Sequence, residues 1–247
     1  ALPQVIGATA ASENAGSLRT RGWELNIDYR HVFQDADNLA IHANFNLADY
    51  KAVITEWDSD NLINTKYSGK EYGEIWGLET ERYFTPDDFN ADGTYKQGVA
   101  KQDKLSDNEK FIFGPGDIKF VDQDGDGEIN WGEGTVEDHG DLVKIGNSTP
   151  RFQYSFRLGA DWKGLDIDLF FQGVGKRDMW SPSAFVMPFM RGADGAIFAG
   201  QTNYITQSEY EAAMAGTGTI RQDADYPRLY AGNLGNDENE GYMAGSE

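Results

Sequence analysis

The sequence of 247 residues contains no cysteine. This absence excludes a disulfide framework and any zinc site that uses thiolate ligands. The sequence also lacks a run of about 18 apolar residues, the length that a transmembrane helix requires. A helical membrane protein is therefore excluded. A membrane β-barrel is not, because each of its strands carries a much weaker hydrophobic signal.

Basic residues are also scarce. The chain has 21 Lys and Arg against 41 Asp and Glu, a formal net charge of −20. We expect no nucleic-acid partner, because such a partner needs a broad basic surface, whereas the acidic surplus is compatible with divalent cations. Proline is sparse, with 7 residues, while glycine (29) and aromatic residues (13%) are abundant. This composition favours strands, turns and long loops over a helical bundle.

Four stretches alternate between apolar and polar residues, the period of a β-strand with one apolar face. They span residues 20–33, 39–51, 151–162 and 165–175. In the first stretch, one face is apolar or aromatic apart from one histidine: Trp23, Leu25, Ile27, Tyr29, His31 and Phe33. The other face is polar: Glu24, Asn26, Asp28 and Arg30. Short breaks separate the stretches in pairs, so we predict two β-hairpins.

The predicted strands are unusually long. They have roughly 11–13 residues, whereas an ordinary soluble strand has about 5–6. Outer-membrane barrel strands need about 9–11 residues to cross and alternate in the same way. Aromatic residues near the strand ends, such as Trp23 and Trp162, suit the aromatic girdles at a membrane surface. The alternative is a soluble protein with a large antiparallel sheet, one face of which is exposed to water.

The connections favour the barrel. Short turns alternate with two very long loops, about 53–150 and 176–247, as short periplasmic turns alternate with long extracellular loops in outer-membrane barrels. We expect short helices in these loops, one of them in TQSEYEAAMAG. Four strands cannot close a barrel, since the smallest barrels need about eight. We therefore expect residues 1–247 to be a fragment of a larger β-barrel domain.

One acidic stretch fits a calcium loop. FVDQDGDGEINWGEG (120–134) satisfies the pattern D-x-[DN]-x-[DN]-G-x5-E. Calcium takes six to eight oxygen ligands, and a glycine at the sixth position permits the sharp turn around the ion. We predict a calcium site with these ligands: Asp122, Asp124, Asp126, Glu128 (through its carbonyl) and Glu133. The flanking segments do not read as helices, so we expect a structural ion rather than a sensor. An Asp/Gly turn without metal is the alternative.

Several segments together resemble the SusC/RagA-like TonB-dependent outer-membrane transporters of Bacteroidetes. They are GEIWGLETERYF (73–84), PGDIKFVDQDGDGEIN (115–130), the segment from KIGNSTPRF to QGVGKRD (144–178) and DADYPRLYAGN (223–233). Their order and spacing match that family over nearly the whole chain, which corresponds to about a quarter of a typical member. Glu81, Arg82 and Ser155 depart from the residues that are common in the family.

The resemblance implies an all-β fold, part of a 22-stranded antiparallel transmembrane barrel in the outer membrane, with the N-terminal plug domain absent from this chain. It implies import of glycans or peptides, as in polysaccharide utilisation, together with a SusD-like surface lipoprotein. TonB would act through parts outside this chain. The remaining partners would be the rest of the barrel and the membrane lipid. The calcium ligands of the family carry over onto the five residues named above.

Two other functions remain as alternatives. The first is a secreted or surface calcium-dependent carbohydrate-binding β-protein, in which the apolar strand faces would pack a closed soluble core. The second is a glycosidase, which would need a pair of carboxylates such as Asp87/Asp88 or Asp166/Asp168. A turn cap and a polar strand face explain these pairs, so we expect no enzyme activity.

Overall fold

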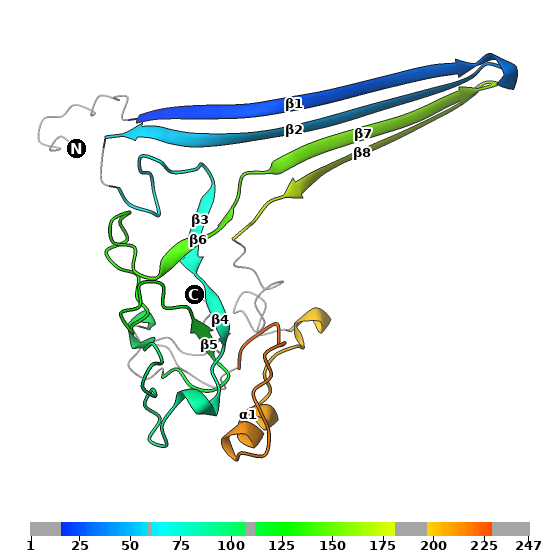
Figure 1. Ribbon diagram of the computed structural model, residues 1–247. Helices are drawn as coiled ribbons and strands as arrows, with labels where there is room; N and C mark the ends of the chain where they lie inside the picture. Colours follow the sequence, from blue (N-terminus) through cyan, green and yellow to red (C-terminus); the bar gives the residue numbers. More distant parts are fainter. Residues whose placement is uncertain (1–15, 59–60, 107–111, 181–196, 229–247) are drawn as a thin grey trace, which may run out of the picture. The chain divides into compact units, whose positions relative to one another are not determined.

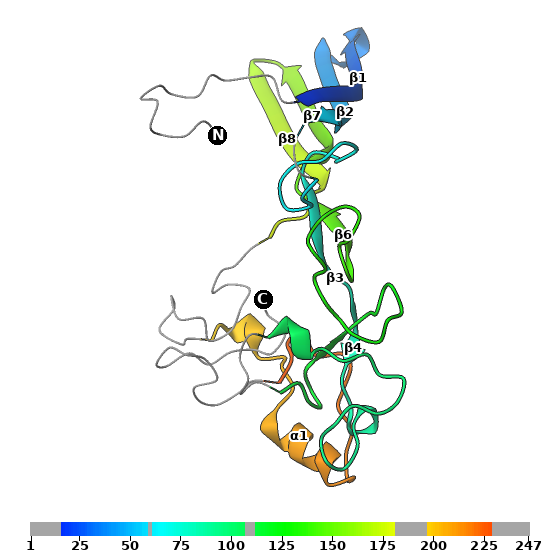
Figure 2. The same ribbon diagram turned by 90° about the vertical axis from the view of Figure 1, so that its left-hand side faces the viewer.

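The computed structural model describes residues 16–58, 61–106, 112–180 and 197–228 (Figures 1 and 2). The chain divides into two compact units, which are described separately. The sheet unit comprises Ala1–Ile75 and Gly146–Met179, and the loop unit comprises Trp76–Ile145 and Trp180–Glu247. Over the described residues strands outnumber helices, which is consistent with the all-β class.

The sheet unit is built on one antiparallel sheet with the strand order β1–β2–β7–β8 (Figure 1). Its strands are β1 (Gly16–Phe33), β2 (Leu39–Trp57), β7 (Arg151–Trp162) and β8 (Leu165–Lys176). β1 begins at Gly16 rather than at residue 20, and β2 ends at Trp57 rather than at residue 51. No sheet among the described residues closes on itself.

Tight turns fix the register of both hairpins. Lys163 and Gly164 have φ angles of 51° and 86°, so both occupy the left-handed region that a two-residue hairpin turn requires. Asp37 and Asn38 are also left-handed, at 55° and 59°. An ion pair of 2.5 Å joins Lys163 Nζ to Asp37 Oδ2 and links the two turns.

The apolar face of this sheet is exposed. Register pairs such as Leu25↔Leu47, Phe45↔Phe156 and Leu158↔Leu169 place apolar side chains of neighbouring strands on one face. The exposed fractions are large for a soluble core: Leu25 43%, Ile27 52%, Phe152 45%, Phe156 36% and Leu169 50%. Nothing in the described part of the chain covers this face.

The loop unit contains short strands and two small cores. β4 (Thr80–Tyr83) pairs with β5 (Ile118–Phe120), and β3 (Glu74–Leu78) pairs with β6 (Leu142–Asn147) as the chain passes between the units. One core contains Phe84, Phe89 and Phe113, and the other contains Tyr83, Ile205, Ala213 and Ile220. The helix expected in TQSEYEAAMAG is α1 (Gln207–Met214), which begins with a capping box between Thr206 and Glu209. None of the described helices is long and apolar enough to cross a membrane.

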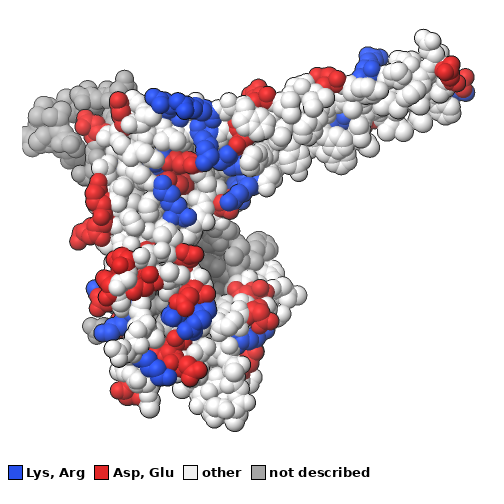
Figure 3. Space-filling model, viewed as in Figure 1, with Lys and Arg blue, Asp and Glu red and all other residues white. Residues whose placement is uncertain are grey.

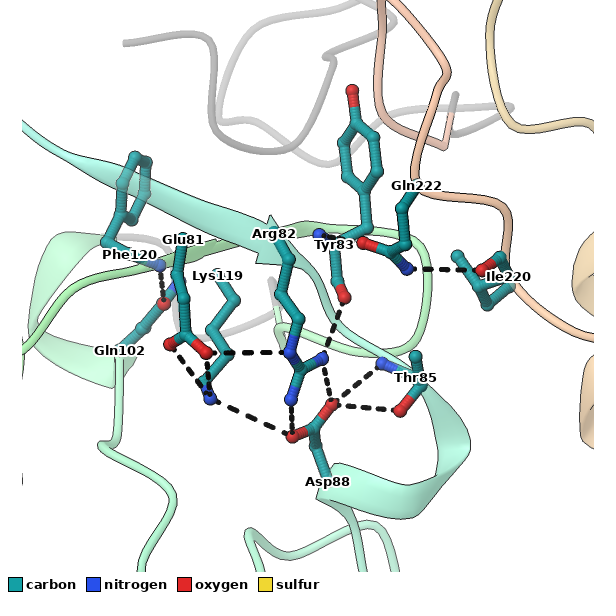
Figure 4. A network of polar contacts seen from close by, with 10 residues as sticks. All are labelled: Glu81, Arg82, Tyr83, Thr85, Asp88, Gln102, Lys119, Phe120, Ile220 and Gln222. Carbon is teal, nitrogen blue, oxygen red and sulfur yellow. Dashed lines mark hydrogen bonds and ion pairs between the residues drawn. The ribbon is translucent and has the colours of Figure 1, made fainter.

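A network of charges holds β4 and β5 together (Figure 4). The Arg82 guanidinium makes two bonds to the carboxylate of Asp88, at 2.6 and 2.7 Å, and Asp88 is buried. The Lys119 ammonium on β5 lies 3.0 Å from Glu81 and 4.0 Å from Asp88. Thr85 N–H donates to Asp88 over 2.8 Å, so Asp88 also caps the turn at Pro86–Asp88. These contacts fix the strand from which the acidic loop begins.

Candidate metal-binding loop

Gln102 positions the start of the acidic loop. Its side chain is fully buried, and its amide donates to Ile118 O (3.0 Å) while its carbonyl oxygen accepts from Phe120 N (2.8 Å; Figure 4). Both contacts satisfy the free edge of β5, whose backbone groups would otherwise be left without partners. The chain leaves β5 at Phe120 and enters the loop two residues later at Asp122.

The aspartate side chains of the loop accept hydrogen bonds from backbone amides of the same loop. The two carboxylate oxygens of Asp122 accept from Gly125 N (2.6 Å) and Gly127 N (2.9 Å). Asp124 and Asp126 each accept from the amide two residues later, at 3.0 and 2.7 Å. Gly125 and Gly127 have φ angles of 77° and 85°, and only glycine adopts such angles without strain. The loop is therefore a chain of side-chain-to-backbone turns.

Asp141 closes the loop, and it is not among the ligands that the sequence motif predicts. Its side chain is fully buried, and its two carboxylate oxygens accept from Gln123 N and Asn130 N, both at 2.8 Å. Asp122, Asp124 and Asp141 bring one carboxylate oxygen each within 4.8 Å of one another. Asp141 lies outside the twelve-residue spacing of the motif. The only signal that could have found it is a lone acidic residue directly before the apolar start of β6.

The other predicted ligands are not members of this three-carboxylate group. Asp126 is exposed and is not part of the three-carboxylate group. The Glu128 carboxylate forms an ion pair with Lys104, whose hydrogen bond lowers the pKa of Glu128. The carbonyl of Glu128 accepts from the Asn130 side-chain amide at 3.2 Å. Glu133 is exposed. The structure thus brings two of the five predicted residues together and adds Asp141 to them.

The three carboxylates have the chemistry of a hard-cation site. Like charges this close repel one another, and a bound cation relieves the repulsion. Each oxygen that accepts one backbone N–H retains a second lone pair. Calcium and magnesium both take carboxylate and carbonyl oxygens. Asp122, Asp124 and Asp141 could therefore hold a divalent cation, and the carbonyls of the loop could supply further ligands.

The carboxylate pairs considered for hydrolysis are engaged in other contacts. Asp88 is held by Arg82, as described above, and Asp168 pairs with Arg157 at 2.6 Å.

Among the aromatic residues of the loops, Tyr67 and Tyr83 are buried, and the Trp76 ring lies 5.3 Å from that of His139. Tyr72 and Trp180 are exposed.

Comparison with known proteins gives two relatives of this chain. TonB-dependent receptor P3 of Formosa agariphila is 25% identical over 183 residues, which cover 69% of this chain and 16% of that protein. TonB-dependent receptor P26 of the same organism is 26% identical over 184 residues, which cover 73% and 17%. The chain is a homologue of part of a TonB-dependent receptor. No family model matches it.

The match concerns a small part of a large protein. The chain spans about one sixth of the length of the curated relatives that it matches. TonB-dependent receptors are outer-membrane transporters rather than enzymes.

Proposed function

We propose that the chain supplies four strands and two long extracellular loops to a SusC/RagA-like, TonB-dependent transporter in the outer membrane of a Bacteroidetes species. The transporter imports glycans or peptides, and a SusD-like lipoprotein caps it. TonB acts through parts of the receptor outside this chain. The observation that carries the proposal is the exposed apolar face of the β1–β2–β7–β8 sheet. This face supports contact with lipid over the alternative of a soluble carbohydrate-binding protein, which needs the same residues in a closed core.

The dimensions of the sheet suit a membrane. Trp23 and Phe33 are aromatic residues on the same face of β1, ten residues apart. At about 3.3 Å per residue they are roughly 33 Å apart along the strand. With a strand tilt of about 40°, this distance corresponds to roughly 25 Å across the membrane, the height of the apolar band of an outer-membrane barrel.

The opposite face of the sheet suits a water-filled lumen. Asn44 Nδ2 donates to Asp28 Oδ1 at 2.6 Å, and Asn46 Nδ2 donates to Ser155 Oγ at 3.2 Å. Arg157 and Asp168 form an ion pair on this face. Barrel strands place polar residues in the lumen and apolar residues against lipid. Among the described residues, β1 and β8 each pair along one edge only. We assign their free edges to neighbouring strands of the same barrel.

A charged substitution on each face tests the proposal. Leu169→Arg places a charge near the middle of the apolar face and should destabilise the intact receptor in lipid vesicles by about 2–4 kcal/mol. Gln172→Arg lies on the polar face of the same strand and should change the free energy of unfolding by less than about 0.5 kcal/mol. Equal effects of the two substitutions would contradict the assignment of the faces.

We also propose that the acidic loop binds a structural calcium ion. Its support is the group Asp122, Asp124 and Asp141, together with the motif that includes Asp126, Glu128 and Glu133. The ion would neutralise the carboxylates and stiffen residues 115–135. Chelation should therefore speed limited proteolysis of this loop and leave the strands intact. Cleavage at the same rate with and without chelator would count against the ion.

A further inference from the structure

Four basic residues gather at one end of the apolar face. Together with Trp23 and Tyr50 they line a groove of about 580 Å³. We name them the basic rim: Arg19, Arg21, Lys51 and Arg151. The only acidic residue that lines the groove is Asp49. The local charge is therefore positive in a chain whose net charge is −20.

The register places Arg19, Arg21 and Lys51 on the face of the sheet that carries Trp23, and the ion pair with Asp49 brings Arg151 to them. Arg21 lies directly opposite Lys51, and Trp23 lies opposite Asp49. Residues opposite each other on paired strands share a face, and so do residues two apart on one strand. Arg19 and Arg21 thus continue the row of Trp23 and the apolar residues that follow it. Figure 3 shows Lys and Arg side chains gathered over one end of the sheet, next to a long surface with few charges.

Two of the four charges have no counterion among the described residues. Lys51 lies 3.2 Å from Glu71, and Arg151 lies 2.5 Å from Asp49. No carboxylate of the described chain lies within 4.0 Å of the exposed guanidinium of Arg19 or Arg21. Like charges directly opposite in a sheet destabilise it. The pair Arg21↔Lys51 therefore favours an anion bound beside it.

We propose that the basic rim binds the phosphate groups of a membrane lipid whose acyl chains lie along the apolar face. This inference rests on the proposed function, which places that face in the outer membrane. The guanidinium group suits phosphate, because its planar set of donors can make two parallel hydrogen bonds. Trp23 lies between the rim and the apolar residues, at the level that an interfacial tryptophan prefers. The continuous apolar face favours a lipid over a free anion.

The rim lies at the end of the sheet that carries the long loops. Gly16 pairs with Trp57, and Arg151 pairs with Lys176. The chain therefore leaves the sheet at this end after Trp57, returns to it at Arg151 and leaves it again after Lys176. In the proposed orientation these loops are extracellular. The bound phosphates therefore belong to a lipid of the outer leaflet.

Lipid binding by the intact receptor that contains this chain tests the inference. The probe is bis-phosphorylated lipid A, titrated into the detergent-solubilised receptor and compared with dephosphorylated lipid A of the same acyl composition. The phosphorylated form should bind more tightly. The double variant Arg19→Gln/Arg21→Gln should weaken its binding about thirtyfold, since each basic residue near a membrane surface contributes about fivefold.

Two matched variants separate charge from folding. Arg19→Lys/Arg21→Lys keeps both charges and should retain most of the binding. Arg30→Gln removes one charge from the polar face of the same strand and should bind like the wild type. Heat-modifiable migration on gels shows that each variant is folded.

Three results would overturn the inference. The first is unchanged lipid binding by the folded Arg19→Gln/Arg21→Gln variant, and the second is equal binding of the two lipid A forms. The third is that inorganic phosphate binds as tightly as the lipid and loses as much affinity in the same variant. Each leaves the proposed function intact as long as the receptor inserts into membranes and imports its substrate. Failure of the wild type to insert would instead contradict the proposed function.

Discussion

The sheet unit and the loop unit are held together in different ways. The sheet unit has regular hydrogen-bonded strands, and its large apolar side chains remain exposed on one face. The loop unit has short strands, buried aromatic clusters and buried carboxylates that join segments far apart in the sequence, as Asp141 joins Gln123 and Asn130. Under the proposed function, contact with lipid accounts for the exposed apolar face of the first unit. The second unit has cores of the kind found in water.

The largest expected effect concerns Asp141. Asp141→Ala removes a buried carboxylate and leaves the amides of Gln123 and Asn130 without acceptors, which should destabilise the loop unit by about 3–5 kcal/mol. It should also lower calcium affinity at least tenfold. Hydrogen exchange and calcium titration of the intact receptor measure both effects. The β1–β2–β7–β8 strands should keep their protection, because none of their contacts involves Asp141.

Glu133→Gln is the matched comparison for Asp141→Ala. Glu133 is the last ligand of the sequence motif but lies outside the three-carboxylate group. We expect the substitution to change stability by less than about 0.5 kcal/mol. A calcium affinity that falls more for Glu133→Gln than for Asp141→Ala would show that the motif spacing describes the ligands better than the three-carboxylate group does.

A smaller effect is expected from the charge network of β4 and β5. Arg82→Leu leaves the buried carboxylate of Asp88 without its main partner. The Arg82 side chain is one-third exposed, so water replaces part of the interaction, and we expect a loss of about 2–3 kcal/mol in the loop unit. Arg30→Leu, on an exposed polar strand face, is the control and should cost little. Thermal unfolding that is the same for both variants would argue against a stabilising role for the network.

The smallest effect is a dependence on pH. Burial raises the pKa of Asp88, but hydrogen bonds from Arg82 and Thr85 outweigh it, so the pKa of this carboxyl in the folded protein lies below its usual range. The carboxylate therefore stabilises the fold above about pH 4, and this contribution is lost as the pH falls through the folded pKa. Proteolysis of the loop unit should increase below pH 4 in the wild type. The increase should be smaller in Arg82→Leu, and an equal increase would show that other carboxylates control it.

The two units also differ in what the sequence could predict. Alternation predicts the sheet because its period depends only on neighbouring residues. It fails where β2 runs on through Ala52, Val53 and Ile54, because three consecutive apolar residues do not alternate, although all three keep the regular pairing with β1. The loop motif predicts Asp122 and Asp124. It cannot predict Asp141 or Gln102, because their roles depend on contacts between distant segments that no spacing rule contains.

The central claim is that the odd-numbered residues of β1 from Trp23 to Phe33 face lipid. The chain has no cysteine, so single cysteines can be placed at each position from 23 to 33 and spin-labelled in the intact receptor, with any other cysteines replaced, after reconstitution in bilayers. Accessibility to oxygen should be high at Leu25, Ile27 and Tyr29. Accessibility to a polar nickel reagent should be high at Asn26 and Asp28. Low accessibility to both reagents at the odd positions would show a closed protein core and contradict the membrane assignment.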